Sequence, residues 1–197
     1  MKAASQLSDV IALLDKGNVG VLPTDTIYGL VGSALNRDVV EKIYRLRQRV
    51  KDKPMIILIA SLNDLNKFNI KLTDTQKEFL KKIWPNPLSV VLPCFSEKFF
   101  YLHRGKKSLA FRMPKDGNLL EMLKQTGPLV APSANFEGEP PAENINQAKK
   151  LFGNKVSFYI DKGKRKAIPS TLIELSDNGT IKILRQGEFK IVQEEVE

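Results

Sequence analysis

Two pairs of polar residues, each pair separated by a single residue, offer the clearest chemistry in this sequence. Ser133 and Asn135 directly follow the apolar run Leu129–Ala131, and Arg47 and Arg49 follow an apolar stripe of helical spacing. Residues two apart face the same side of an extended chain. Two converging guanidiniums favour an anion with several oxygens, such as a triphosphate. A hydroxyl beside a carboxamide can hold a phosphate oxygen or a metal-bound water without competing with the arginines for negative charge.

Each pair also has a plainer interpretation. If residues 47–49 are still helical, the two arginines point about 200° apart and form a solvated basic helix end. Ser133 and Asn135 are residue types that favour Ser and Asx turns for their own reasons. The sequence alone leaves both interpretations open for each pair.

A third polar group follows an apolar strand in the stretch GVLPTDTIYGL, residues 20–30. Pro23 ends the strand, and Thr24, Asp25 and Thr26 come directly after it. In open α/β sheets, ligands bind beyond the ends of strands. The alternative is a turn with an N-cap for a short helix, which Thr and Asp would serve equally well.

Several familiar sites are excluded or disfavoured. The sequence contains no G-x-x-x-x-G-K-[ST] phosphate loop and no G-x-G-x-x-G after a strand. Its one histidine, His103, lies beside basic residues, where an exposed loop histidine is expected rather than a member of a Ser-His-Asp triad. One cysteine, Cys94, excludes an intramolecular disulfide, which fits a reducing cytoplasm. One His with one Cys also argues against a structural zinc site.

The hydrophobic pattern predicts the elements that must position these residues. Helices and strands alternate early and strands crowd the C-terminal third, which predicts a mixed β-sheet flanked by helices. Helices are expected at 4–16, 37–47, 73–83 (with Thr73 or Asp74 as N-cap), 116–125 and 143–152. Strands are expected at 19–23, 55–60, 89–92, 109–113, 129–131, 158–160, 171–175 and 181–184.

The composition favours a single domain over residues 1–197, with a core at about 4–187 and a tail at 188–197. Its apolar runs are too short to span a bilayer, and the N-terminus has the pattern of an amphipathic helix rather than of a secretory signal. We therefore expect a cytoplasmic protein that does not engage a membrane. The net charge of +9 suggests an anionic partner, such as a nucleotide, phosphate or RNA.

Seven segments in this order resemble the YrdC-like family, the threonylcarbamoyl-AMP synthases. They are PTDTIYGL, RQRVKDKP, WPNPLSVVL, SLAFRMP, PLVAPSANFEGEPP, GKRKAIPSTLIEL and LRQG, and they cover nearly the whole chain. No single segment is specific, but the ordered set is. The family signature is a Lys-x-Arg and a Ser-x-Asn. The second is intact as Ser133 to Asn135, whereas in the first Arg47 stands at the Lys position, Arg49 matches, and Val50 replaces the usual Pro.

The resemblance implies a curved mixed α/β sheet with a large, positively charged concave cavity. It implies the condensation of L-threonine, bicarbonate and ATP to L-threonylcarbamoyl-AMP and pyrophosphate, with magnesium. The product would feed the threonylcarbamoyl modification of adenosine beside the anticodon of certain tRNAs, completed by threonylcarbamoyl-transferase partner proteins. The chain looks like the short, single-domain form of the family.

The resemblance also assigns roles to individual positions. No side chain has to become covalent, and Mg²⁺ would arrive with ATP, so no dedicated protein metal cage is expected. The segment 161–170 is a basic candidate for closing over the site. The catalytic residues would be Arg47, Arg49, Ser133 and Asn135; the threonine contacts Thr26, Arg112 and Ser170; and the ATP contacts Arg49, Lys53, Ser108, Ser133 and Arg185.

Two other interpretations remain open. One is a protein of the same fold that binds double-stranded RNA or tRNA through its positive charge and lacks synthase activity. The basic groups lack interleaved aromatics, which disfavours single-strand binding by stacking. The other is a paralogue that has lost the activity. The intact Ser133 to Asn135 motif argues against it, and Arg47 leaves it open.

Overall fold

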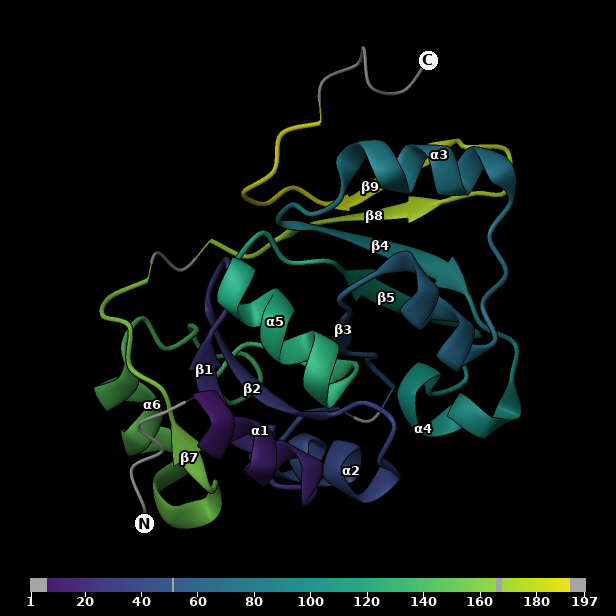
Figure 1. Ribbon diagram of the computed structural model, residues 1–197. Coiled ribbons are helices and arrows are strands. Elements are labelled where there is room, and N and C mark those ends of the chain that lie inside the picture. Colours follow the sequence, from purple (N-terminus) through teal and green to yellow (C-terminus); the bar gives the residue numbers. More distant parts are fainter. Residues whose placement is uncertain (1–6, 51, 166–167, 192–197) are drawn as a thin grey trace.

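The computed structural model describes residues 7–50, 52–165 and 168–191, and each expected helix and strand is present there (Figure 1). Residues 4–6 of the first expected helix lie outside the described ranges. The α-helices are α1 (Leu7–Asp15), α2 (Arg37–Arg47), α3 (Asp74–Ile83), α4 (Phe100–His103), α5 (Gly117–Thr126) and α6 (Ile145–Phe152). The 3₁₀ helices are η1 (Leu62–Phe68), η2 (Glu97–Phe99) and η3 (Gly153–Lys155). The strands are β1 (Gly20–Pro23), β2 (Tyr28–Ser33), β3 (Ile56–Leu58), β4 (Leu88–Pro93), β5 (Ser108–Arg112), β6 (Leu129–Val130), β7 (Phe158–Tyr159), β8 (Thr171–Leu175) and β9 (Ile181–Arg185).

The strands form one mixed sheet in the order β7-β1-β2-β6-β3-β5-β4-β8-β9. The pairs β1/β7, β3/β5 and β4/β8 are parallel, and the remaining neighbours are antiparallel. The expectation of a mixed sheet with helices on its faces is therefore confirmed. None of the helices in the described residues is long and apolar enough to cross a membrane.

Side chains alternate along the strands between two hydrophobic clusters. Leu30 and Ile57 belong to the larger cluster, whereas their neighbours Val31 and Leu58 belong to the smaller one. Helices α1 and α5 pack on the smaller cluster, and α2, α3, α4 and α6 contribute to the larger one (Figure 1). Because the alternation has a period of two, strand register decides which face a polar residue reaches.

A cavity of about 700 Å³ lies on the same face as the smaller cluster, beside the part that α1 and α5 cover. Ile56 and Ala131 both border that cluster and line the cavity, which places the two on one face. Its lining residues recur at a spacing of two on β5 (Ser108, Ala110 and Arg112) and on β8 (Leu172 and Glu174). Every second side chain of β5 and β8 therefore faces the cavity, and these side chains form its floor.

Strand β2 was missing from the expected elements. Its sequence contains Gly29 and Gly32, which weaken the local strand signal. The packing explains Gly32, because a Cβ there would lie 2.4 Å from Cγ1 of Val39 on α2. The residues Thr24–Ile27 form the hairpin turn between β1 and β2 and do not cap a short helix. At α3, the cap is Thr73, whose side chain accepts a hydrogen bond from the N–H of Gln76.

Candidate active site

The segment that leaves β6 is held between β2 and β3 by backbone hydrogen bonds. Ser133 pairs with Gly29, and Ala134 N–H donates to Tyr28 O at 2.9 Å. Asn135 is buried, and its Nδ2 donates to the carbonyls of Phe136 and Glu139 at 2.8 and 2.7 Å. The Asn135 carboxamide therefore organises the turn, while the partly exposed Ser133 lines the cavity.

Helix α2 ends at a tight corner, of which residues 47–50 and 52–54 are described. Gln48 adopts a left-handed conformation (φ 51°), and Arg49 N–H donates back to Tyr44 O at 3.0 Å. Arg47 is the last helical residue and Gln48 is left-handed, so the stretch 47–49 is neither wholly helical nor extended. The left-handed residue between the two arginines still brings both side chains to the cavity.

Arg47 binds the Ser133 segment. Its Nε donates to Asn135 O at 3.2 Å, and its Nη2 donates to Ser133 Oγ at 3.1 Å and Asn135 Oδ1 at 2.9 Å. Burial, with the nearby charge of Arg49, lowers the pKa of Arg47 to about 10. That both guanidiniums face a triphosphate stays a prediction. Arg47 lines the cavity, but its Nε and Nη2 donate to protein oxygens and orient the Ser-x-Asn segment.

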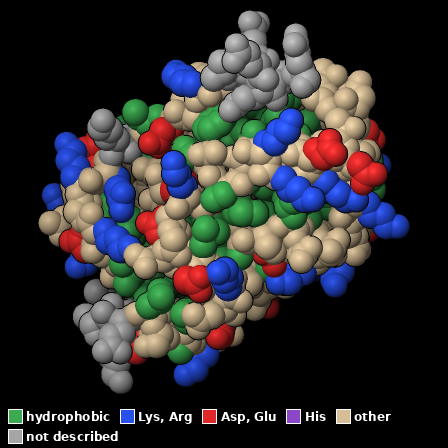
Figure 2. All heavy atoms as spheres, turned by 45° about the horizontal axis from the view of Figure 1, so that its top comes forward, with side chains coloured by type: hydrophobic (Ala, Val, Ile, Leu, Met, Phe, Trp, Pro, Cys, Tyr) green, Lys and Arg blue, Asp and Glu red, His purple; other side chains and the backbone are tan. Residues whose placement is uncertain are grey.

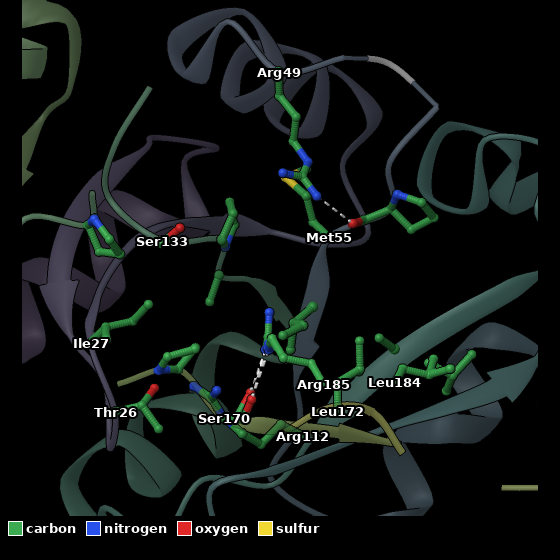
Figure 3. Close-up of a pocket in the computed structure, with 18 of the residues that line it drawn as sticks. Thr26, Ile27, Arg49, Met55, Arg112, Ser133, Ser170, Leu172, Leu184 and Arg185 are labelled. Atoms are coloured by element: carbon green, nitrogen blue, oxygen red, sulfur yellow. Dashed lines mark hydrogen bonds between the residues drawn. The ribbon is translucent and has the colours of Figure 1, made fainter. Parts of the chain in front are cut away.

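Arg49 is the more available of the two arginines. Its Nε donates to Lys53 O and its Nη2 to Pro54 O, each at 3.1 Å, and the guanidinium projects into the cavity (Figure 3). Lys53, expected to contact ATP, does not line the cavity. Its ammonium pairs with Glu137 at 2.6 Å. We call this part of the cavity, with Arg47, Arg49, Ser133 and Asn135, the α2 end.

The opposite wall, which we call the β5 end, carries Thr26, Arg112, Ser170 and Arg185 (Figure 3). Arg112 is buried and its Nη2 lies 3.1 Å from Asp25 Oδ1, whose side chain is also buried. Burial lowers the pKa of Arg112, and the charge of Asp25 offsets part of that effect. Arg112 Nε is buried without a hydrogen-bond partner among the described residues, so it is a donor ready for a ligand oxygen.

Two hydroxyls at the β5 end are oriented by neighbouring groups. Thr24 Oγ1 donates to Ile27 O at 2.7 Å and lies 3.1 Å from Thr26 Oγ1. Since Thr24 has one hydroxyl proton, Thr26 must donate to Thr24, which leaves the Thr26 oxygen free to accept from a ligand. Ser170 Oγ lies 2.9 Å from Ser89 Oγ.

The turn that carries Ser170 is fixed by close packing at the segment after β9. Arg185 Nη2 donates to Ser170 O at 2.8 Å. A Cβ at Gly187 would fall 2.3 Å from Pro169 O, so only glycine allows this approach. Burial and the charge of Arg112 lower the pKa of Arg185, consistent with two cations sharing one wall.

Of the ten expected site residues, all except Lys53 line this one cavity. Sequence reasoning did not single out Asp25, Glu137 and Ser89 as partners of the expected residues. Asp25 and Glu137 lie inside the quoted segments, so the signal for them was their position beside Thr26 and Asn135. Ser89 lies on β4, a strand that was read only as apolar.

His103 was expected on an exposed loop, and this is wrong. It ends α4, is 1% exposed, and its Nδ1 accepts a hydrogen bond from Gly105 N–H at 3.2 Å. The basic residues around it concealed an apolar helical turn, in which Leu102 is also buried.

The chain is similar to several known proteins over most of its length. The family model Sua5_yciO_yrdC, described as telomere recombination, matches residues 12–187. A Bacillus subtilis protein named threonylcarbamoyl-AMP synthase is 30% identical over 98% of this chain and 56% of its own length. A protein of the same name from Yersinia enterocolitica is 30% identical over 92% of this chain and 95% of its own length.

A solved structure shares the fold. The crystal structure of P. abyssi Sua5 complexed with L-threonine matches with a TM-score of 0.83 and 30% identity, over 92% of this chain and 54% of that one. The chain therefore spans about half the length of the B. subtilis and P. abyssi relatives. The family model covers most of the chain, including both ends of the cavity, and the chain therefore belongs to the Sua5/YciO/YrdC family.

Proposed function

We propose that this chain condenses L-threonine, bicarbonate and ATP to L-threonylcarbamoyl-AMP and pyrophosphate. The observation that carries the proposal is one cavity with two unlike cationic ends. The arginines of the α2 end pair with no carboxylate among the described residues, whereas the β5 end has the Arg112–Asp25 pair. The B. subtilis and Y. enterocolitica relatives are named for this activity, and the P. abyssi relative was crystallised with L-threonine.

The proposed reaction needs no nucleophilic side chain. The threonine amine attacks bicarbonate carbon to give a carbamate and water, and a carbamate oxygen then attacks the α-phosphorus of ATP. Pyrophosphate leaves with the electrons of the broken P–O bond. Catalysis then depends on holding the carbamate against the α-phosphate and on neutralising charge.

The β5 end suits a free amino acid. Arg112 Nε is an unpartnered buried donor for the threonine carboxylate, and Thr26 Oγ1 is an acceptor for an ammonium or hydroxyl group. Asp25 compensates the charge of Arg112, while Arg185 leaves this end with a positive charge that attracts the threonine carboxylate.

The α2 end suits the triphosphate. Arg49 brings a guanidinium without a carboxylate partner in the described part of the chain, and Ser133 brings a hydroxyl whose proton is not used by Arg47. Ser108, on β5, and Arg185, at the β5 end, also line the cavity and are proposed to contact ATP.

Magnesium is proposed to enter with ATP. The described residues contain no cluster of three His, Cys, Asp or Glu side chains that could hold a metal ion. The oxygens of Ser133 and Asn135 already accept from Arg47, and Glu139 and Glu174 are exposed. This donor set fits an ion that the triphosphate carries rather than an ion held by protein ligands.

We propose that transferase partner proteins pass the product to adenosine beside the tRNA anticodon. The alternative of an RNA-binding protein without synthase activity gains no support from the names of the relatives. On the face drawn in Figure 2, Lys and Arg side chains stand among acidic and hydrophobic ones instead of forming an unbroken basic stripe.

The deciding experiment is pyrophosphate release from ATP with each substrate omitted in turn. We expect release to require threonine and bicarbonate together. Release that continues without threonine would indicate a plain ATP pyrophosphohydrolase. Absence of release together with salt-sensitive RNA binding would favour the alternative.

A further inference from the structure

Two segments distant in sequence hold each other at the mouth of the cavity by contacts in both directions. From the corner, Arg47 donates to Ser133 and Asn135, as described above. From the other segment, Glu137 N–H donates to Arg47 O at 2.9 Å. The Glu137 carboxylate accepts from the N–H of Val50 through Oε2 and from Lys53 Nζ through Oε1.

The second set of contacts bears on Arg49. The Arg49 guanidinium is aimed by the carbonyls of Lys53 and Pro54, which belong to the corner that Glu137 holds. Tyr44 Oη is a further tie to Lys53 O, at 2.9 Å. Apolar packing contributes little at the corner, because Val50 is 54% exposed.

The bond at residue 50 uses a main-chain N–H. Val50→Pro would remove it, because proline has no N–H, and would leave the Glu137–Lys53 ion pair in place.

A carboxylate beside an anion site needs a physical reason, since its charge repels phosphate. The Lys53 ammonium neutralises part of that charge at 2.6 Å. Hydrogen bonds from Lys53 and from the Val50 N–H lower the pKa of Glu137, so that it is ionised at neutral pH. The role left for the Glu137 carboxylate is to accept hydrogen bonds from two donors of the corner at once.

We propose that Glu137 is a positioning residue, which fixes the corner so that Arg49 is oriented before an anion arrives. The proposal rests on the proposed function in that the anion is the triphosphate of ATP. Preorganisation of this kind strengthens binding by removing the cost of ordering a loop on association. We call the contacts of Glu137 with Val50 and Lys53 the brace. Neither Val50 nor Lys53 has to contact the ligand for the brace to act.

The test is ATP binding measured by calorimetry, without threonine or bicarbonate. We expect Glu137→Ala to weaken ATP binding about 10-fold, the size of one charge-assisted hydrogen bond. Glu137→Gln keeps an oxygen for the Val50 N–H and should lose only about threefold. The matched control is Glu121→Ala, which removes a 2.6 Å ion pair with Lys124 on α5, away from the cavity. It should bind ATP as the wild type does.

The sign of the effect separates the proposal from simple electrostatics. If Glu137 acted only as a negative charge near phosphate, Glu137→Ala would bind ATP as tightly as the wild type or more tightly, and that result overturns the proposal. Purified Glu137→Ala should have a KM for threonine within about twofold of wild type, since a general loss of structure would raise both KM values. If that variant does not fold, Glu137→Gln carries the same test, and unchanged ATP binding in it overturns the proposal.

The same data distinguish this proposal from the proposed reaction. Wild-type protein that binds ATP through the brace but releases no pyrophosphate with threonine and bicarbonate would reject the reaction and retain the positioning role. Equal ATP binding by wild type and Glu137→Ala, with normal pyrophosphate release in the wild type, would reject the positioning role alone. Wild-type protein that does not bind ATP would reject both.

Discussion

The buried arginines at the two ends of the cavity have different kinds of partner. At the β5 end, Arg112 has a buried carboxylate partner, Asp25, so the charge of this arginine is compensated. At the α2 end, Arg47 is surrounded by a backbone carbonyl, a hydroxyl and a carboxamide, and positive charge remains in excess. An arginine that is balanced by a carboxylate suits a neutral ligand, whereas one balanced only by dipoles leaves a field that attracts a polyanion.

The comparison predicts different consequences for losing an arginine at each end. At the β5 end, removing Arg112 strands a buried charge on Asp25. At the α2 end, removing Arg49 strands nothing, because its protein contacts are with carbonyls on a partly exposed loop. Stability and substrate affinity should therefore respond differently.

The largest effect is expected for Arg112→Met. Breaking a buried ion pair costs roughly 3–5 kcal/mol of stability because one charge is left uncompensated. The double variant Arg112→Met/Asp25→Asn should regain most of that stability but not threonine affinity. Urea unfolding and the KM for threonine would measure the two effects. If the single and double variants unfold at the same urea concentration, the unpaired Asp25 charge costs no stability, and the two residues do not form a compensating pair.

Ser133→Ala is expected to lower pyrophosphate release by roughly 10²–10³-fold, the usual cost of one preorganised polar contact to the reacting group. Its stability should change little. Asn135→Ala should also lower the rate severely, and it should lower stability as well, because Arg47 and two backbone carbonyls lose their partner. Thermal unfolding beside rate assays would separate them. Near wild-type turnover in both variants would leave this segment a turn without a catalytic role.

Arg49→Ala is expected to weaken ATP binding about 10- to 150-fold, which corresponds to the loss of a charge-assisted hydrogen bond. Arg45→Ala is the control, since Arg45 is exposed on α2 and does not line the cavity. Calorimetric titration of ATP would compare the two. Equal losses of ATP affinity in the two variants would indicate a diffuse electrostatic patch and would favour the RNA-binding alternative.

The smallest effect is expected for Thr26→Val, which preserves shape and removes one acceptor. The KM for threonine should rise about 10-fold, with the KM for ATP unchanged. Thr24 keeps its bond to Ile27 O, so the hairpin turn should survive. A parallel rise in both KM values would mean that Thr26 shapes the turn rather than selecting the amino acid.

Much of the fold could be predicted because its signals are local. Helix α3 has both a capping residue at Thr73 and an apolar stripe, and β8 has the alternation of a half-buried strand. Strand β2 was missed because Gly29 and Gly32 weaken its local signal, and the reason for Gly32 is a tertiary contact with Val39 on α2. His103 was misplaced because burial depends on the packing of α4, and its neighbours in sequence are charged.

For the candidate site, too, the sequence predicted one part and not another. Residue types at strand ends and the ordered segments were enough to name the side chains that meet at the cavity, with Lys53 as the exception. Their partners could not be named, because nothing in the sequence says that Asp25 meets Arg112 or that Glu137 meets Val50.

The sequence by itself determined most of the elements, the family and most of the polar residues of the cavity, since these follow from periodicity and from motifs that lie along the chain. Only the tertiary structure decided what each residue does there. Helix α2 presents Arg47 to Ser133 and Asn135, and the left-handed Gln48 then turns the chain so that Arg49 also lines the cavity. The physical reason is that a hydrogen bond or an ion pair depends on separations of about 3 Å between atoms that may be a hundred residues apart in sequence.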